Sequence, residues 1–426
     1  MKNTLWILLV CSTSLLPAQK TLVLDSVLQQ AEAHYPLKRQ ELLIDQQRNF
    51  SLAALNKGFL PQLSINGQAS YQSDVTSVPV VLPGISIETL DKDQYRITAD
   101  MTQVLYDGGN IEAQKNIQRA GAEVEQARMK VELQKMRELV RKYYLGVLML
   151  DEQIEQLEIT DKDIELGIRR MESAVKNGVA FRSQLSVLQA EALKNKQRMT
   201  ELRAGRSSLL QVLSLYTGSP IGSGDLLERP PVAAPAPSLT LKIDIQRPEL
   251  NMFSAQQNLA DQQRKWIGSK SLPKLSLFGQ GGYGRPGLNM LENDFKLYYI
   301  AGARLNWNVG AFYTLQAERS NNRIAKMTTD VNRDLYLRTA EITVTQYRND
   351  IDKYEQMLKD DDAILSIRDE IMNATKAQLD NGVITSSDYL REVNAYDQAR
   401  QSKLLHELQL LQARLDLNDY LANNPR

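Results

Sequence analysis

The most regular feature of the sequence is a seven-residue apolar repeat, interrupted only by Asp161, in two tracts that contain no proline. All fourteen prolines lie outside residues 84–219 and 287–424, and glycine is also missing from 311 to 381. A seven-residue apolar repeat predicts helices that supercoil in a left-handed sense around their neighbours. The heptad stripe of the second tract comprises Leu337, Val344, Ile351, Leu358, Leu365, Met372 and Leu379. Its equivalent in the first tract comprises Leu133, Val140, Val147, Ile154, Asp161, Ile168 and Val175.

Each stripe predicts one very long helix, over residues 111–176 and 311–380. At 1.5 Å per residue, such a helix is about 100 Å long. Both helices end at an Asn-Gly pair, which suits the left-handed turn that closes a helix. A second apolar-periodic helix follows each of them, over 184–216 and 386–421. The pattern therefore predicts two long helical hairpins, in which Asp161 should face water or a basic partner.

Four shorter segments alternate apolar and polar residues, as strands with one apolar face do. Ile97 and Ala301 fall on the apolar face and Thr98 on the polar face, so arginine should be disruptive at the first two positions and tolerated at the third. The third segment alternates more weakly than the others. The expected strands cover about 62–73, 94–105, 274–284 and 295–307, one pair ahead of each long helix.

Aromatic residues gather near the ends of these strands. Tyr71, Tyr95, Tyr283 and Tyr299 lie near one end, and Tyr106 and Trp307 near the other. Strands of about ten residues with an apolar outer face and aromatic girdles are typical of a transmembrane β-barrel. For a single strand, an antiparallel sheet with one wet face would explain the pattern as well.

Four strands cannot close a barrel, and open sheet edges are not stable in lipid, so chains must associate. Two chains would supply eight strands and a filled interior, whereas three would supply twelve and leave room for a channel. The polar inner faces favour three chains. The expected fold is mainly α with β, a trimeric α-helical barrel of long coiled-coil helices joined to a transmembrane β-barrel.

The chain contains two copies of one plan. Residues 60–71 match residues 272–283 at seven of twelve positions, and Pro36 aligns with Pro248. Each copy comprises a helix, two strands, a long helix and a return helix. The expected division is a signal peptide (1–18), a first repeat (19–218), a proline-rich connector (219–242) and a second repeat (243–422).

The expected signal peptide rests on Lys2, the apolar run of residues 5–16, and Pro17-Ala18. The alternative is a lipoprotein signal ending at Cys11, but Val10 is bulky where a small residue is needed. In either case the sequence indicates a protein that leaves the cytoplasm.

Composition excludes several classes of function. Lys+Arg and Asp+Glu both number 51, which gives no basic footprint for nucleic acid. One cysteine and two distant histidines cannot form a zinc set or a disulfide framework. Residues 279–284 match GxGxxG by letter but do not open a helix, so they lack the context of a dinucleotide site. We expect no enzyme activity, metal or cofactor.

Three short motifs recur in the same order in both halves. They are Leu-Pro-x-Leu at 60–63 and 272–275, Leu-Tyr-Asp-Gly-Gly at 105–109 with Trp-Asn-Val-Gly at 307–310, and Asn-Gly-Val at 177–179 and 381–383. With these motifs the mature chain resembles the TolC family of outer-membrane efflux and secretion ducts. Val309 stands where the first half has a glycine.

The resemblance implies a homotrimer in the outer membrane of a Gram-negative bacterium, in contact with outer-membrane lipid and with a long periplasmic extension. Its partners would be a periplasmic adaptor (membrane fusion protein) and an inner-membrane transporter. The chain would be the passive duct of a tripartite efflux or type I secretion system. The hypothesis from another class is a periplasmic coiled-coil adaptor or scaffold protein, with or without a lipid anchor.

The resemblance also suggests site residues. In the family an acidic residue six positions after the tip glycine can line the periplasmic entrance, which matches Asp388 in the second half but Gln184 in the first. The next acidic position of the family is Arg391 here. Thr385 and Asp388 also form a capping-box pattern, so Asp388 has a local alternative role.

The expected site residues fall into three groups. The entrance candidates are Asp388, Gln184, Arg391 and Arg182. The helix-hairpin tips, expected to contact the adaptor, are Asn177, Gly178, Val179, Asn381, Gly382 and Val383. The candidates for the barrel lumen are Arg96, Asp100 and Arg304.

Overall fold

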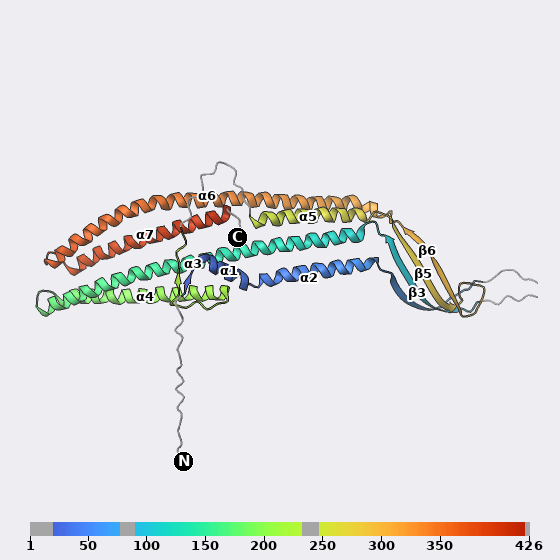
Figure 1. The fold of residues 1–426 in the computed structure, drawn as a ribbon, viewed down its shortest axis with the longest axis horizontal. Coiled ribbons are helices and arrows are strands. Elements are labelled where there is room, and N and C mark those ends of the chain that lie inside the picture. Colours follow the sequence, from blue (N-terminus) through green and yellow to red (C-terminus); the bar gives the residue numbers. More distant parts are fainter. Residues whose placement is uncertain (1–19, 77–89, 232–246, 422–426) are drawn as a thin grey trace, which may run out of the picture. The chain divides into compact units, whose positions relative to one another are not determined.

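The computed structural model describes residues 20–76, 90–231 and 247–421. The expected signal peptide with Cys11, and part of the expected connector, lie outside these residues. The predicted fold class, mainly helical with one antiparallel sheet, is confirmed (Figure 1). The longer helices are α1 (Leu24–His34), α2 (Leu37–Asn56), α3 (Asn110–Lys176), α4 (Arg182–Thr217), α5 (Pro248–Ser269), α6 (Ala311–Asp380) and α7 (Ser386–Leu421). A short 3₁₀ turn, η1, covers Lys57–Phe59.

The chain divides into two compact units, and the long helices α3 and α6 contribute residues to both. The first unit comprises the described residues within 1–38, 132–247 and 338–426, and the second comprises those within 39–131 and 248–337. The first unit is almost entirely helical. Within it, α4 returns beside α3 and α7 returns beside α6, which makes two antiparallel hairpins (Figure 1).

The core of the first unit lies where α1, α3 and α4 meet. Val140 and Val147 of the heptad stripe are fully buried, as are Ala31 of α1 and Leu213 of α4. The Tyr144 hydroxyl lies 2.6 Å from the carbonyl oxygens of Leu22 and Glu228. Leu22 ends the short strand β1 (Thr21–Leu22) and Glu228 follows its parallel partner β4 (Leu226–Leu227), so Tyr144 links the strand pair to α3. Burial raises the pKa of Tyr144, which keeps its proton on the hydroxyl.

Polar contacts set the register of α7 against α3. The Asp397 carboxylate accepts hydrogen bonds from Thr160 (2.8 Å) and Gln156 (3.3 Å). Farther from the tips, Asp419 accepts a bond of 2.7 Å from Gln134. Because buried polar groups are costly without partners, these contacts favour one alignment of the two helices.

The heptad stripe is on the packed side of both long helices. Val344 is fully buried, and the other six members of the second stripe are partly buried rather than exposed. Asp161, the polar member of the first stripe, accepts a hydrogen bond of 3.2 Å from the buried amide of Asn195 on α4. Its partner is therefore an amide, and not the lysine or arginine that the sequence suggested as an example.

The second unit contains a four-stranded antiparallel sheet in the order β2-β3-β5-β6. The strands are β2 (Gln62–Tyr71), β3 (Asp93–Tyr106), β5 (Lys274–Arg285) and β6 (Lys296–Asn306). The central pair β3 and β5 comes from the two different repeats, so the sheet joins them. The register shifts between Val104 and Tyr106, which marks a bulge at the end of β3 next to α3.

The turn from β3 into α3 explains the first Gly-Gly motif. Asp107 accepts hydrogen bonds from the backbone N–H groups of Gly109 (2.9 Å) and Ile111 (2.6 Å). Gly108 has φ +72°, and a Cβ there would lie 2.9 Å from Cβ of Leu272. In the second half Gly310 has no positive φ. The second turn therefore does not repeat the left-handed conformation of Gly109, its equivalent in the first half.

Candidate functional sites

Both helical hairpins close with the same backbone motif. At the end of α3, Val179 N–H donates to the carbonyl of Ala174 (3.0 Å), and Gly178 has φ +77°. At the end of α6, Val383 N–H donates to the carbonyl of Gln378 (2.9 Å), and Gly382 has φ +71°. This is the Schellman arrangement, which needs a left-handed residue and therefore favours glycine.

The tips expose apolar side chains. Val179 is 79% exposed and Val383 is 71% exposed. Phe181, which the sequence analysis missed, is 77% exposed between Gly178 and α4. Its signal was present, since it is a large aromatic residue in a tip of five residues. Exposed apolar groups at the same place on two hairpins are a surface that a partner helix could cover.

Asp388 caps α7. Its Oδ2 accepts hydrogen bonds from the Thr385 hydroxyl (2.7 Å) and the Thr385 backbone N–H (3.2 Å), and Asp388 N–H donates to the Thr385 hydroxyl (3.2 Å). These contacts, led by the hydroxyl of Thr385, lower the pKa of Asp388 below its ordinary value. The capping box is thus formed, and one oxygen of the carboxylate, Oδ1, points elsewhere.

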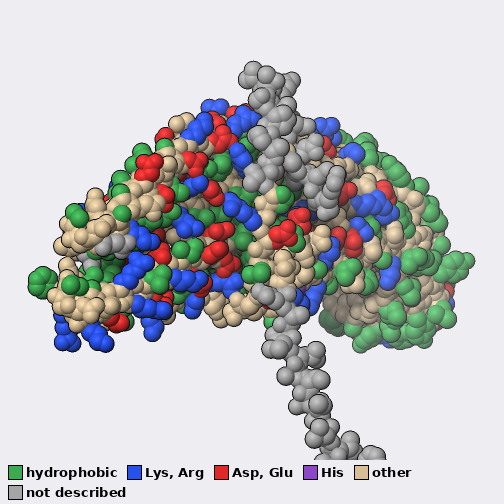
Figure 2. Space-filling model, turned by 60° about the vertical axis from the view of Figure 1, so that its left-hand side comes forward, with side chains coloured by type: hydrophobic (Ala, Val, Ile, Leu, Met, Phe, Trp, Pro, Cys, Tyr) green, Lys and Arg blue, Asp and Glu red, His purple; other side chains and the backbone are tan. Residues whose placement is uncertain are grey.

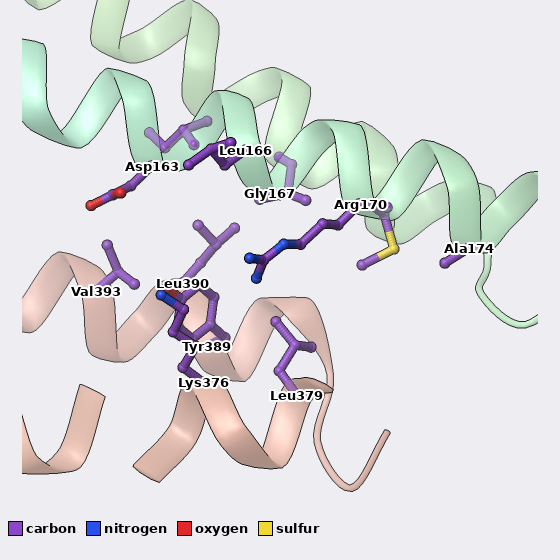
Figure 3. A pocket seen from close by; sticks show the side chains of 13 residues that line it. Asp163, Leu166, Gly167, Arg170, Ala174, Lys376, Leu379, Tyr389, Leu390 and Val393 are labelled. Carbon is purple, nitrogen blue, oxygen red and sulfur yellow. The ribbon is translucent and has the colours of Figure 1, made fainter. Parts of the chain in front are cut away.

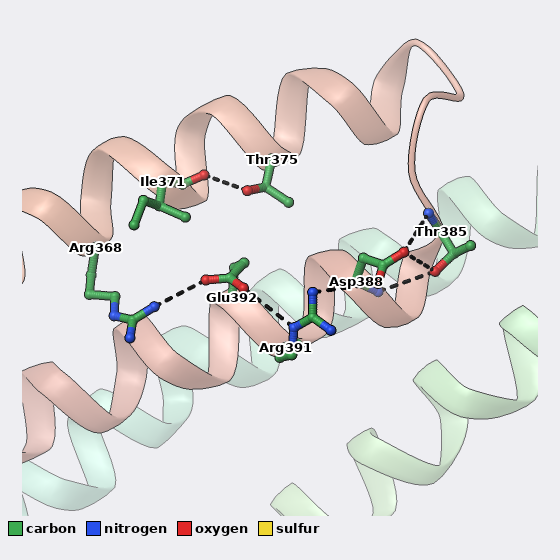
Figure 4. Close-up of polar contacts among 7 residues, drawn as sticks. All are labelled: Arg368, Ile371, Thr375, Thr385, Asp388, Arg391 and Glu392. Atoms are coloured by element: carbon green, nitrogen blue, oxygen red, sulfur yellow. Dashed lines mark hydrogen bonds and ion pairs between the residues drawn. The ribbon is translucent and has the colours of Figure 1, made fainter.

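That second oxygen faces Arg391. Figure 4 shows the guanidinium of Arg391 between two carboxylates, with Oδ1 of Asp388 at 3.6 Å and Glu392 at 3.4 Å. Glu392 in turn pairs with Arg368 of α6 at 3.1 Å. Asp388 therefore belongs to a chain of alternating charges, and its negative charge is offset one turn away.

Gln184 occupies the equivalent position in the first hairpin. Its amide oxygen accepts a hydrogen bond of 3.3 Å from the backbone N–H of Phe181. The position six residues after the tip glycine is thus a helix cap in both hairpins, and only the second carries charge. Arg182 is the first residue of α4 and its side chain is exposed.

The two hairpins pack together just inside their tips. Met171 of α3, Leu188 of α4 and Leu390 of α7 form a buried apolar cluster. Beside it lies a cavity of about 250 Å³, lined by residues of both hairpins (Figure 3). Its polar lining includes Asp163, Arg170 and Lys376. In Figure 3 the side chain of Arg170 reaches from α3 into the space before α7.

The sheet of the second unit has one apolar and one polar face. Leu63 pairs with Met101, and Tyr283 pairs with both Ile97 and Leu297, so apolar residues form continuous rows across the strands. Leu297 is 83% exposed. Figure 2 shows hydrophobic side chains gathered over the sheet.

The three expected lumen residues, Arg96, Asp100 and Arg304, share the opposite face. Asp100 accepts hydrogen bonds from Asn66 (2.7 Å), Thr98 (2.9 Å) and Gln280 (2.5 Å). The guanidinium of Arg304 lies over the ring of Phe278 at 4.7 Å. Lys274 and Lys296 also lie on this face, and both are exposed.

The described residues offer neither a membrane-spanning helix nor a metal cluster. Within residues 20–76, 90–231 and 247–421, no helix combines the length and apolar character needed to cross a bilayer. The same residues contain no group of three or more His, Cys, Asp or Glu side chains placed to hold a metal ion.

The outer membrane efflux protein family matches residues 27–218 and 242–423, which covers both repeats. This chain belongs to the outer membrane efflux protein family. As a member it is an outer-membrane efflux duct protein with a helical periplasmic extension, as the motifs indicated. Among curated proteins, none matches the chain.

Solved structures share the fold of this efflux protein at low sequence identity. The outer membrane protein VceC from Vibrio cholerae is 12% identical, with a TM-score of 0.69 over 93% of this chain and 95% of its own. The CmeC outer membrane channel of Campylobacter jejuni is 13% identical, with a TM-score of 0.70 over 93% and 85%. A membrane protein from Pseudomonas aeruginosa is 15% identical, with a TM-score of 0.72 over 93% and 90%.

Proposed function

We propose that this efflux protein is a passive duct made of three copies of the chain, closed by a twelve-stranded barrel. The observation that carries the proposal is the two-faced sheet with open edges. In the described sheet, β2 and β6 each have a single neighbour, so each leaves one edge of backbone groups without a strand partner. Unpaired backbone groups cost several kcal/mol each in lipid, so edge strands of neighbouring copies should pair.

The face assignments follow from the same sheet. The exposed apolar face, with Leu63, Ile65, Leu297 and Tyr299 all more than 70% exposed, suits contact with lipid. The polar face, with Arg96, Asp100 and Arg304, would then line the lumen. No chemical step is required of such a duct, because an inner-membrane transporter would choose and drive the cargo.

The tips are the proposed contact with a periplasmic adaptor. Their support is the pair of exposed valines, Val179 and Val383, at identical places in the two hairpins, together with Phe181. An adaptor helix laid against them would bury apolar surface at about 25 cal/mol per Å². The entrance residues Asp388, Gln184, Arg391 and Arg182 lie beside the same tips.

The duct is tested by fractionation and planar-bilayer recording of the full chain. It should require detergent to leave the outer membrane, migrate as a trimer and give single-channel conductance. Release by carbonate without conductance would contradict the duct and favour the scaffold hypothesis.

The adaptor contact is tested separately. Val179→Asp/Val383→Asp should lower copurification of the adaptor while the conductance of the purified trimer stays unchanged. Ser208→Asp, at an exposed position of α4 far from the tips, is the matched control. Equal copurification for both variants would contradict the contact.

A further inference from the structure

Four basic side chains stand on the polar face of the sheet in two groups. Arg96 of β3 and Lys296 of β6 share one row, because Gly284 of β5 pairs with both of them. We call these two residues the first basic pair. All side chains of this row point to the polar face, since neighbouring residues alternate between faces.

The second basic pair, Lys274 and Arg304, lies at the other end of the same face. Arg304 pairs with Ser276, which stands in the row of Val104, and Lys274 pairs with Asn306 in the next row of that face. Eight residues of β3 separate Arg96 from Val104, a distance of about 26 Å at 3.3 Å per residue. The two pairs therefore occupy opposite ends of the polar face.

The only carboxylate on the described polar face is Asp100, midway between the two pairs, and it is engaged by three hydrogen-bond donors. The face thus carries four positive side chains and one negative side chain, a formal excess of three positive charges per chain. Among the acidic residues near this face, Asp294 interacts with the charge of Lys296, and three others form ion pairs. Glu292 forms an ion pair with Lys296, and Asp91 and Asp93 pair with Arg285 at 3.1 and 2.6 Å.

The basic side chains are available to solutes. All four are exposed, and within the described residues only Lys296 has an ion-pair partner. Arg304 instead lies over the ring of Phe278. Counting the Glu292 pair, the excess is still two positive charges per chain, and the low-dielectric wall of a pore focuses such a field on its interior.

We propose that the polar face of the sheet makes the duct prefer anions, and that the two basic pairs are the residues that set this preference. The class of solute favoured is small anions and cargo that carries carboxylate or phosphate groups. The inference rests on the proposed function, in which this face lines the lumen. The opposing field expected from Asp388 at the entrance is weakened, because Arg391 offsets it.

The test uses the native full-length protein in planar bilayers under a tenfold KCl gradient. The reversal potential should lie nearer to the equilibrium potential of chloride than to that of potassium. The chloride-to-potassium permeability ratio should be about two or more in dilute salt. The ratio should approach one in molar salt, where the Debye length falls to about 3 Å. A pore that discriminates by size alone would not show this salt dependence.

Two double variants locate the effect. One is Arg96→Gln/Lys296→Gln and the other is Lys274→Gln/Arg304→Gln. Each should shift the reversal potential toward the equilibrium potential of potassium. The matched control Arg96→Lys/Arg304→Lys keeps the charges and should keep the native value. Potassium preference in the native channel, or an unchanged reversal potential in conducting Gln variants, would overturn the inference and leave the duct intact. Trimers that never conduct would overturn the duct itself, and the inference with it.

Discussion

Oδ1 of Asp388 lies 3.6 Å from the guanidinium of Arg391, one turn further along α7. The carboxylate thus has two functions with separate oxygens, since Oδ2 caps the helix through Thr385. In a trimer the three copies would form a ring of ion pairs rather than a ring of bare carboxylates. The two functions can be separated by substitution.

The first prediction concerns the charge of the entrance. Arg391→Gln removes the cation that offsets Asp388, so it should make the channel more permeable to cations and more sensitive to block by multivalent cations. Adding Asp388→Asn in the same chain should cancel the gain. Reversal potentials of the two variants in dilute KCl measure the effect. Equal values in both would show that Asp388 is a helix cap without influence on permeation.

The second prediction concerns the cap. The pKa of Asp388 is lowered in the folded chain, mainly by the hydroxyl of Thr385 and then by its backbone N–H. The cap therefore contributes stability above the ordinary pKa of 3.8, and the contribution is lost as the pH falls through the lowered value. Asp388→Ala should melt below the native protein at neutral pH, and the two should converge under strongly acidic conditions. Asp388→Asn should keep part of the stability that alanine loses, because its amide oxygen can still accept hydrogen bonds from Thr385.

The third prediction concerns the heptad stripe. Val344→Asp would place a charge where no water or partner is available, and such substitutions are among the most destabilising, at about 3 kcal/mol or more. Ile351→Asp, at a partly buried position of the same stripe, should cost less. The control is Gln346→Asp on the exposed side of the same turn, expected within about 0.5 kcal/mol. Urea midpoints of the three variants in detergent give the order, and a silent Val344→Asp would contradict the stripe.

The long helices and the alternating strands could be predicted because their signals are local. Both helical tracts lack proline, and the second also lacks glycine from 311 to 381, which allows very long helices. Leu63, Ile65 and Ile97 alternate with polar neighbours. Contacts between distant helices could not be predicted in the same way. Asp161 is accommodated on the stripe because the Asn195 side chain of α4 donates a hydrogen bond to it. No pattern in the sequence links the two positions.

The site was only partly predictable, for the same reason. Lys274 was not a lumen candidate because β5 is rich in glycine, so its alternation is weak. Thr98 was expected to tolerate arginine, but it is only 7% exposed. Thr98 pairs with Gly282 of β5, and the ring of Tyr298 lies over that glycine. Glycines let aromatic rings lie flat on a sheet, and the sequence does not show which ring will use the space.

The fourth prediction concerns the α3–α7 contact. Burial raises the pKa of Asp397, while bonds from Thr160 and Gln156 oppose the shift. The contribution of this group to stability is therefore full below pH 3.8 and is lost as the pH rises through the raised value. Asp397→Asn has no buried carboxyl to ionise. Its melting temperature should therefore increase relative to that of the native protein as the pH rises from mildly acidic to neutral. Thr160→Val removes one opposing bond and should steepen the dependence in the native background. A pH-independent difference between Asp397→Asn and the native protein would contradict the assignment.

The fifth prediction concerns the faces of the sheet. Ile97 is 62% exposed on the apolar face, where an arginine would meet lipid and cost about 2 to 4 kcal/mol if it lies near the middle of the bilayer. Ala301 lies on the same apolar face, so Ala301→Arg should have the same effect as Ile97→Arg. The matched control is Gln68→Arg rather than Thr98→Arg, because Gln68 is exposed on the polar face and pairs with Arg96. The yield of heat-modifiable trimer in outer membranes should fall for Ile97→Arg and Ala301→Arg and stay native for Gln68→Arg. The same Gln68→Arg variant adds a positive charge beside the first basic pair, so its channels should also be more selective for chloride than native ones. If Gln68→Arg lost the trimer while Ile97→Arg assembled normally, the face assignment would be the wrong way round, with the apolar rows inside the barrel.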